Sequence, residues 1–169
     1  MFAWAGPYVQ VSRTLAPVTI TSPSAGLFVV DFGANLAGVT RLVGVKCKAG
    51  DTITLHHGEI LQHAGIPGLK NADPKRVYYG NLRSAKATDV YTCRGDADGE
   101  TWHPRLTYHG FRFVEIQVDS SISITKDNLQ MLHFHSAVQQ KSKVKILSTE
   151  LACTNTQTCK NTRIHTRYQ

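Results

Sequence analysis

Aromatic, imidazole and guanidinium side chains are crowded into one short segment of the chain. Arg105, Tyr108, His109 and Arg112 lie within eight consecutive residues. A flat apolar ring beside a few well-placed polar groups is how carbohydrate sites are usually built. The alternative interpretation is that Tyr108 and Phe111 pack in the core or against another domain. The segment is therefore a candidate for contact with a carbohydrate or with a neighbouring domain.

A second polar segment precedes it in the chain and contains Asn81, Arg83, Lys86 and Asp89. Its charges favour an ion-pair network on a solvated loop that packs on a neighbouring domain. Sugar recognition through Asn81, Arg83 and Asp89 is the alternative, because amide, guanidinium and carboxylate groups all form hydrogen bonds with hydroxyls. These three residues join the candidate carbohydrate or interdomain contacts.

Carboxylates are the side chains that would hydrolyse a glycosidic bond. That reaction needs two of them across the scissile bond, roughly 5–9.5 Å apart. No acid of this chain occurs in a motif that indicates a raised pKa beside an ionised partner, so we expect no catalytic residue. The candidates by residue type are Asp31, Glu59, Asp89, Glu100 and Glu115.

The most metal-like cluster contains His56, His57, Glu59 and His63. A zinc site needs three or four convergent ligands. Neighbouring histidines on a strand point to opposite faces of the sheet, so His56 and His57 cannot bind one ion together. We therefore interpret this segment as a strand end, and we expect neither a metal nor a cofactor.

Short β-rich runs punctuated by Gly, Pro and Asp make up most of the chain. They predict an all-β fold, an antiparallel β-sandwich of the jelly-roll or concanavalin-like type. In residues 31–38 we expect a turn in which Gly33, Asn35 or Gly38 takes a positive φ. A long polar loop is expected over residues 62–77. The expected strands cover residues 7–12, 18–21, 27–30, 40–47, 52–56, 89–93, 111–116 and 132–135.

Length and composition indicate one globular domain with a tail. The chain has 169 residues, of which 41% are hydrophobic, and no apolar run approaches the roughly 18 residues of a membrane span. Its net charge of +7 is concentrated in residues 137–169, which hold 6 basic residues and one acid. We expect a β-sandwich over residues 7–136 and a weakly structured, basic, Thr/Asn-rich tail over residues 137–169. The basic residues are scattered and few aromatics accompany them, so we expect no nucleic-acid partner and no membrane partner.

The four cysteines form no C-x-x-C pair. Cys47 and Cys93 lie in apolar, strand-like segments and are expected to be small core residues. Cys153 and Cys159 could bridge, but their spacing does not demand it. Because the pattern is not a disulfide framework, it leaves the redox compartment and the localisation open.

Four segments resemble one known family in order and in spacing. They are Asp-Phe-Gly-Ala-Asn-Leu-Ala-Gly at residues 31–38, the strand with His-Gly-Glu-Ile-Leu at residues 52–61, and residues 81–91 and 104–115. Together they resemble the concanavalin-like β-sandwich domain of the bacterial α-L-rhamnosidases. The resemblance covers about residues 7–136.

The resemblance implies a non-catalytic accessory module, or a fragment, of an enzyme that hydrolyses terminal α-L-rhamnose by an inverting route. In that family the catalytic acids lie in a separate helical-barrel domain downstream, which would be the partner of this domain. Residues 137–169 fall where the family crosses toward that barrel. We therefore expect a truncated product, a partial sequence or an isolated module that is inactive alone. The alternative is a stand-alone, lectin-like module that binds rhamnose-containing glycans.

Overall fold

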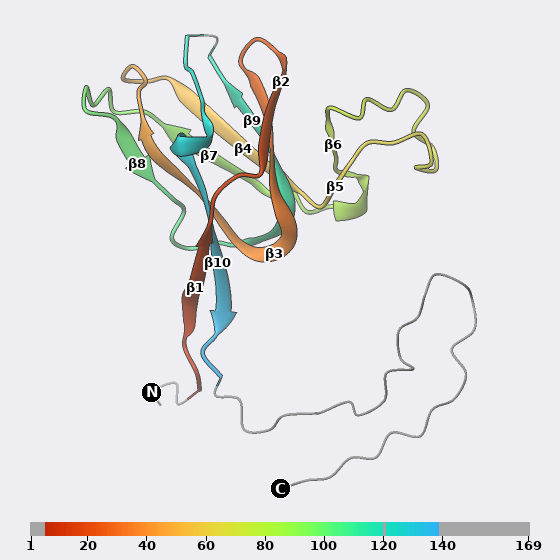
Figure 1. Cartoon of the computed structure of the whole chain (residues 1–169), viewed down its shortest axis with the longest axis horizontal. Coiled ribbons are helices and arrows are strands. Elements are labelled where there is room, and N and C mark those ends of the chain that lie inside the picture. The colour runs from red at the N-terminus through yellow and green to blue at the C-terminus, as the bar shows by residue number, and fades with distance from the viewer. Residues whose placement is uncertain (1–5, 120, 139–169) are drawn as a thin grey trace, which may run out of the picture. The chain divides into compact units, whose positions relative to one another are not determined.

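The strands of the domain form two antiparallel sheets (Figure 1). The computed structural model describes residues 6–119 and 121–138. Those residues contain two short 3-10 helices and no α-helix. The all-β prediction is therefore confirmed. The elements are β1 (Val9–Leu15), β2 (Thr19–Ser24), β3 (Leu27–Val45), β4 (Thr52–Gly58), β5 (Ile60–Leu61), β6 (Val77–Tyr78), η1 (Gly80–Leu82), β7 (Thr88–Thr92), β8 (Glu100–Trp102), β9 (His109–Val118), η2 (Lys126–Asn128) and β10 (Leu129–Ser136).

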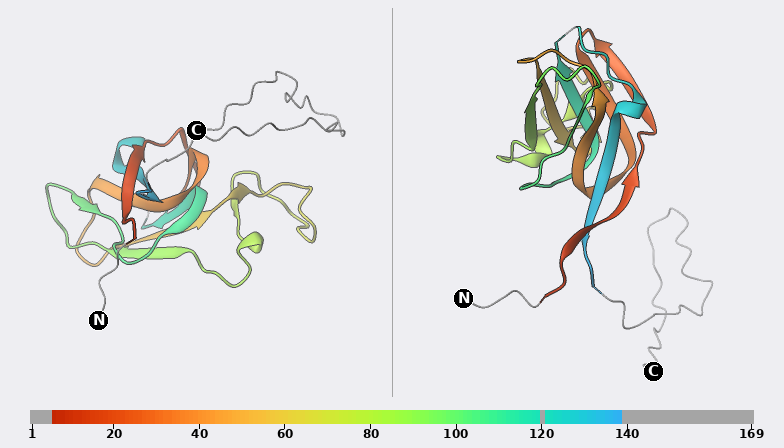
Figure 2. Two further views of the ribbon diagram at one scale, coloured as in Figure 1. Left: turned by 90° about the horizontal axis from the view of Figure 1, so that it is seen from below. Right: turned by 90° about the vertical axis from the view of Figure 1, so that its left-hand side faces the viewer.

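The long strand β3 connects the two layers of the sandwich. Up to Gly38 it pairs with β9, which continues to β4 and then to the edge strand β7. From Gly38 onward it pairs with β10, which continues to β1. Strands β2 and β8 pair with its two ends. One curled sheet of eight strands therefore supplies both layers (Figures 1 and 2).

Strand β3 bends where the sequence predicts a turn. Its register with β9 shifts between Asp31 and Leu36, and Gly33 has φ +80°. A carboxylate oxygen of Asp31 accepts a hydrogen bond from the Gly33 N–H at 2.6 Å. The positive φ predicted for this segment is confirmed at Gly33. The predicted turn is wrong, because the strand continues through a bulge instead of reversing.

Gly38 lies where β3 passes from one layer to the other. It pairs with His109 on β9 and with His133 on β10. A Cβ atom at this position would lie 2.1 Å from the carbonyl oxygen of Leu132. Glycine is therefore required for the backbones of β3 and β10 to approach this closely.

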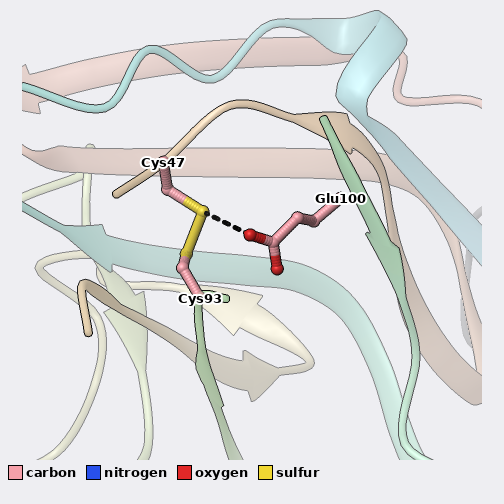
Figure 3. Close-up of side chains that lie close together, drawn as sticks. All are labelled: Cys47, Cys93 and Glu100. Carbon is pink, nitrogen blue, oxygen red and sulfur yellow. Dashed lines mark hydrogen bonds between the residues drawn. A yellow bond between two sulfur atoms is a disulfide. The ribbon is translucent and has the colours of Figure 1, made fainter. Parts of the chain in front are cut away.

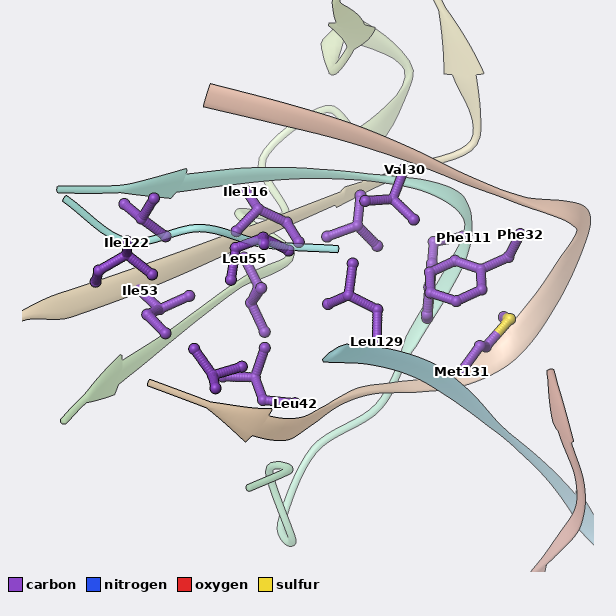
Figure 4. Close-up of a cluster of buried hydrophobic side chains, with 14 of the residues drawn as sticks. Val30, Phe32, Leu42, Ile53, Leu55, Phe111, Ile116, Ile122, Leu129 and Met131 are labelled. Atoms are coloured by element: carbon purple, nitrogen blue, oxygen red, sulfur yellow. The ribbon is translucent and has the colours of Figure 1, made fainter. Parts of the chain in front are cut away.

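The main hydrophobic core fills the space between the two layers (Figure 4). Side chains alternate along each strand, so that every second residue points into this space. Ile53 and Leu55 of β4 thereby join Leu42 of β3 in one cluster. Fully buried members of the cluster are Val30, Leu42, Ile53, Leu55, Phe111, Val114, Ile116 and Met131.

The predicted polar loop is confirmed and runs between the short paired strands β5 and β6. Val77, at its end, packs against Val29 and Phe113 in a second small cluster on the other side of β9. Arg76 forms an ion pair with Glu115 of β9 at 2.7 Å. The base of the loop is thus anchored to the outer face of the sheet.

A disulfide joins Cys47, just after β3, to Cys93, just after β7 (Figure 3). Cys93 is buried as the sequence predicts, Cys47 is only half-buried, and the bond between them is a feature that the cysteine pattern does not indicate. The Cys93 N–H donates to the carbonyl oxygen of Asp51 at 2.8 Å, which holds the two segments side by side. Glu100 lies beside the bridge, but bonded sulfurs are not the thiolates that a metal ion needs.

The two ends of the described chain lie side by side, because β1 pairs with β10 (Figure 1). The Ala137 N–H donates to the carbonyl oxygen of Tyr8 at 2.8 Å. In the part of the chain that is described, no helix is long and apolar enough to cross a membrane. The predicted tail lies outside the described residues from residue 139 onward, as do Cys153 and Cys159, and its boundary at residue 136 stays a prediction.

Candidate functional site

Arg112 of the first candidate segment is held in an ion pair. It lies on β9, and its Nε and Nη2 atoms donate to the two carboxylate oxygens of Asp31, each at 2.8 Å. This hydrogen bonding by Arg112 holds the pKa of Asp31 below its usual value, although partial burial opposes the shift. The ion pair therefore links Asp31, at the start of the bulge in β3, to β9.

Asp89 and His109, candidates from different segments, meet in the folded domain. Nε2 of His109 lies 3.1 and 3.0 Å from the two carboxylate oxygens of Asp89. The His109 side chain is only 12% exposed and the Asp89 side chain only 9%. Strand β9 carries His109 and the edge strand β7 carries Asp89. Between them, β4 supplies His57, whose ring stacks on His109 with centroids 4.4 Å apart.

His57 is fully buried and neutral. Its Nδ1 atom lies 3.0 Å from the carbonyl oxygen of Ala87, which only accepts hydrogen bonds, so Nδ1 carries the proton. Nε2 then accepts a hydrogen bond from the hydroxyl of Thr40 at 3.0 Å. Burial, and next the neighbouring His109, lower the pKa of His57 to about 4. The ring is therefore uncharged at neutral pH.

The His57–Asp89–His109 cluster has the residue types of a metal site but not the directions. Possible ligand atoms of the three side chains lie within 4.8 Å of one another. The histidine rings, however, are stacked with an interplanar angle of 24°. Their in-plane lone pairs therefore run side by side, whereas a metal ion needs ligands that converge on one point. We interpret the cluster as a buried polar network that holds β4, β7 and β9 together.

Asn81 of the second candidate segment contacts Glu59. The Asn81 amide donates to one carboxylate oxygen at 2.6 Å, and the Asn35 amide donates to the other at 3.2 Å. Arg83 follows η1, is exposed, and has φ +55°, which is uncommon for a residue other than glycine. Asn81 and Arg83 thus contribute to the exposed polar surface near the end of β4.

The last two candidate acids, Glu100 and Glu115, also accept hydrogen bonds within the domain. Glu100 is buried and accepts hydrogen bonds from the Tyr91 hydroxyl and from the backbone N–H groups of residues 94–96. Burial raises the pKa of Glu100, but these donors outweigh it and lower the pKa to about 2. Glu115 accepts two bonds from Arg76, at 2.9 and 2.7 Å. Each of the five candidate carboxylates therefore has a hydrogen-bond donor within the domain.

Arg105 and Tyr108 lie on the exposed loop between β8 and β9, where the Tyr108 side chain is 67% exposed. The first part of this loop lines an open cleft with a volume of about 540 Å³. Arg41, Trp102 and His103 also line the cleft. Sequence reasoning does not select these three residues, although Trp102, one of two tryptophans in the chain, is a signal that could have found the site.

The fold defines an antiparallel, concanavalin-like β-sandwich domain. Residues 21–135 match the family described as bacterial alpha-L-rhamnosidase concanavalin-like domain. The chain belongs to this family, which confirms the resemblance drawn from its four motifs.

The similar proteins are much longer than this chain. The α-L-rhamnosidase of Streptomyces avermitilis is 42% identical over 111 residues, which are 66% of this chain and 10% of that protein. An α-L-rhamnosidase of Formosa agariphila is 31% identical over 114 residues, again 66% of this chain and 11% of that protein. The chain therefore spans about a tenth of the length of these curated relatives.

Solved structures of α-L-rhamnosidases contain the same fold. The structure from Dictyoglumus thermophilum matches with a TM-score of 0.69 at 30% identity, covering 82% of this chain and 14% of that one. The Streptomyces avermitilis α-L-rhamnosidase complexed with L-rhamnose matches with a TM-score of 0.67 at 35% identity, covering 78% of this chain and 12% of that one.

Proposed function

We propose that this domain is a non-catalytic accessory module of an α-L-rhamnosidase. The hydrolysis itself would take place in a separate, helical-barrel domain of the same enzyme. The match to only 10% and 11% of two relatives supports this proposal, because most of each relative lies outside the matched region. The observation that carries it is the bonding of the acids, since all five candidate carboxylates are engaged within the domain.

Engaged acids argue against hydrolysis for a chemical reason. An inverting glycosidase needs one acid with a raised pKa and a second carboxylate that activates a water molecule. The pKa values of Asp31 and Glu100 are lowered instead, because donors stabilise their ionised forms. Asp89 and Glu115 face His109 and Arg76 at hydrogen-bond distance. A carboxyl group whose pKa is lowered, as in Asp31 and Glu100, is a poor proton donor.

Hydrolysis of a chromogenic aryl α-L-rhamnoside tests the proposal. The purified full chain should release no product above the buffer rate, while the complete Streptomyces avermitilis relative releases it under the same conditions. Turnover by the chain that disappears in Glu59→Gln, without a change in melting temperature, would overturn the proposal.

An accessory role also predicts that the domain supports its enzyme structurally. Replacing the matched segment of the Streptomyces avermitilis relative with residues 21–135 of this chain should give a folded, active chimera. Deleting the segment should lower the melting temperature and the yield of soluble enzyme. A deletion variant with unchanged activity and melting temperature would contradict the supporting role.

A second candidate function is the binding of rhamnose-containing glycans by the domain alone. The exposed ring of Tyr108, on the same loop as Arg105, favours it, because such rings stack on sugars. A calorimetric titration with L-rhamnose up to millimolar concentration should then give saturable heat that is lost in Tyr108→Ala. Val90→Ala is the matched control, since the Val90 side chain is 57% exposed and lies on β7. A flat titration would reject this function.

A further inference from the structure

The polar loop between β5 and β6 projects from one side of the sandwich (Figures 1 and 2). The pairing of β5 with β6 closes its base, and the Gln62 N–H donates to the carbonyl oxygen of Arg76 at 2.9 Å. The ion pair of Arg76 with Glu115 and the packing of Val77 attach this base to the sheet. The base of the loop is therefore held by contacts that do not involve its tip.

Lys70 and Asn71, in the tip of the loop, are exposed and lack the backbone hydrogen bonds of its base. Their N–H groups have no acceptor among the described residues. Further along the loop, the N–H groups are bonded again, from Asp73 to the Gln62 side chain and from Lys75 to the Asp73 side chain. A protease acts most readily where the backbone is exposed and not hydrogen-bonded. The Lys70–Asn71 bond meets both conditions.

Lys48 is an exposed lysine with the opposite backbone environment. Its N–H donates to the Asp51 carboxylate at 2.8 Å, and its carbonyl oxygen accepts from the Asp51 N–H at 3.1 Å. The next turn residue, Gly50, donates to the carbonyl oxygen of Cys93 at 2.9 Å. Cleavage after Lys48 would first have to break these bonds. Because both lysines are charged and exposed, backbone hydrogen bonding is what distinguishes Lys70 from Lys48.

The Cys47–Cys93 disulfide spans the loop in sequence, so a chain cut after residue 70 stays in one covalent piece. The cut would separate β1–β5 from β6–β10 along the chain. Among the described strands, every pairing except that of β2 with β3 nevertheless joins a strand before the cut to a strand after it. The two pieces also share the main hydrophobic core. Both the covalent bond and the sheet therefore hold the cut domain together.

We propose that the Lys70–Asn71 bond is a processing site for a protease that cleaves after basic residues, and that the cut domain persists as two disulfide-linked chains. Hydrolysis adds one water molecule across the C–N bond, which leaves a carboxylate on Lys70 and an amino group on Asn71. No electrons are transferred, so the disulfide is unaffected. Long loops often contact a neighbouring domain, and cleavage here alters such a contact without unfolding the sandwich. The inference does not rest on the proposed function.

Limited digestion of the full chain with trypsin tests the proposal. Among the bonds of residues 6–138, the first to be cut should be the one that creates Asn71 as a new amino terminus, which terminal sequencing identifies. Cuts beyond residue 138 do not affect this result, because the new terminus specifies the bond. On a denaturing gel, the pieces on the two sides of this cut should separate only after a reductant is added.

Two matched variants identify the cleaved bond. Lys70→Gln should slow the appearance of the Asn71 terminus by at least about tenfold, because the protease requires a basic side chain before the bond. Lys48→Gln removes the other exposed lysine and should leave that rate unchanged. Without reductant, the cut protein should melt within about 5 °C of the intact chain.

Three results would overturn the inference. If another bond of residues 6–138 is cut first, or none is cut, the loop is not the accessible site. Equal cleavage rates for the two lysine variants would exclude recognition of Lys70. Loss of the thermal transition after the cut would show that the sheets and the disulfide do not hold the two pieces in the native fold.

Discussion

Removal of the Cys47–Cys93 disulfide should destabilise the domain by about 4 kcal/mol. The bridged residues are 46 positions apart, and the loop-closure entropy for a loop of that length corresponds to about 4 kcal/mol at 25 °C. This is a large share of the roughly 5–15 kcal/mol by which a domain is usually stable. At roughly 3 °C per kcal/mol, the melting temperature of Cys47→Ser/Cys93→Ser should fall by about 12 °C.

Urea unfolding followed by tryptophan fluorescence, with and without a phosphine reductant, measures this effect. Reductant should lower the midpoint of the full chain to that of the double serine variant and should not change the variant further. The control Cys153→Ser/Cys159→Ser alters the other two cysteines and should keep the reductant-sensitive midpoint. The reasoning is refuted if reductant leaves the midpoint unchanged and peptide mapping finds Cys47 and Cys93 as free thiols in untreated protein.

Three single substitutions test other parts of the scaffold. Gly38→Ala should destabilise the domain by about 3 kcal/mol in thermal melts, because its Cβ would lie 2.1 Å from a backbone oxygen of β10. Gly110→Ala, whose Cβ meets nothing within 4 Å, is the control, and equal melting of the two variants would contradict the packing argument. Ionised Glu100 stabilises the fold above its usual pKa of 4.5, and this contribution is lost as the pH falls toward about 2. Glu100→Gln should therefore be less stable than the parent chain at neutral pH and converge with it in acid, whereas a gap that is constant with pH would count against the assignment. Asp31→Asn removes the charged acceptor of Arg112 and should lower both the melting temperature and its salt dependence; an unchanged melt would show that the bulge holds without the pair.

Most strands could be predicted because alternation is a local signal. In β4, Ile53 and Leu55 are fully buried and lie two residues apart, as the alternation of residues 52–56 indicates. The continuation of β3 could not be predicted in this way. Gly33 and Asn35 favour a turn when considered alone. The strand nevertheless continues past them, because β3 pairs with β9 before and after the bulge and with β10 from Gly38 onward. Long-range pairing therefore overrides local preference here.

The disulfide and the cleft depend on which distant segments meet. Nothing in the spacing of Cys47 and Cys93 indicates that the ends of β3 and β7 lie together. Arg41 and Trp102 likewise come from strands that are neighbours only in the folded domain. Of the residues that line the cleft, sequence reasoning selects Arg105 alone, because it lies next to the aromatic and imidazole groups of its own segment.

The candidate residues separate into two groups according to what they bind after folding. Asp89, His109 and Arg112 have their polar atoms bonded within the domain. For any of them to bind a sugar, such a bond would first have to break and leave a partly buried partner unsatisfied, which is unfavourable. Arg105 and Tyr108 are exposed on the loop between β8 and β9 and form none of the ion pairs found among the described residues. Residue type does not distinguish the two groups, because both contain a guanidinium group and an aromatic or imidazole ring. The difference is the set of hydrogen bonds made on folding, and it directs the search for a ligand to this loop and the cleft that it lines.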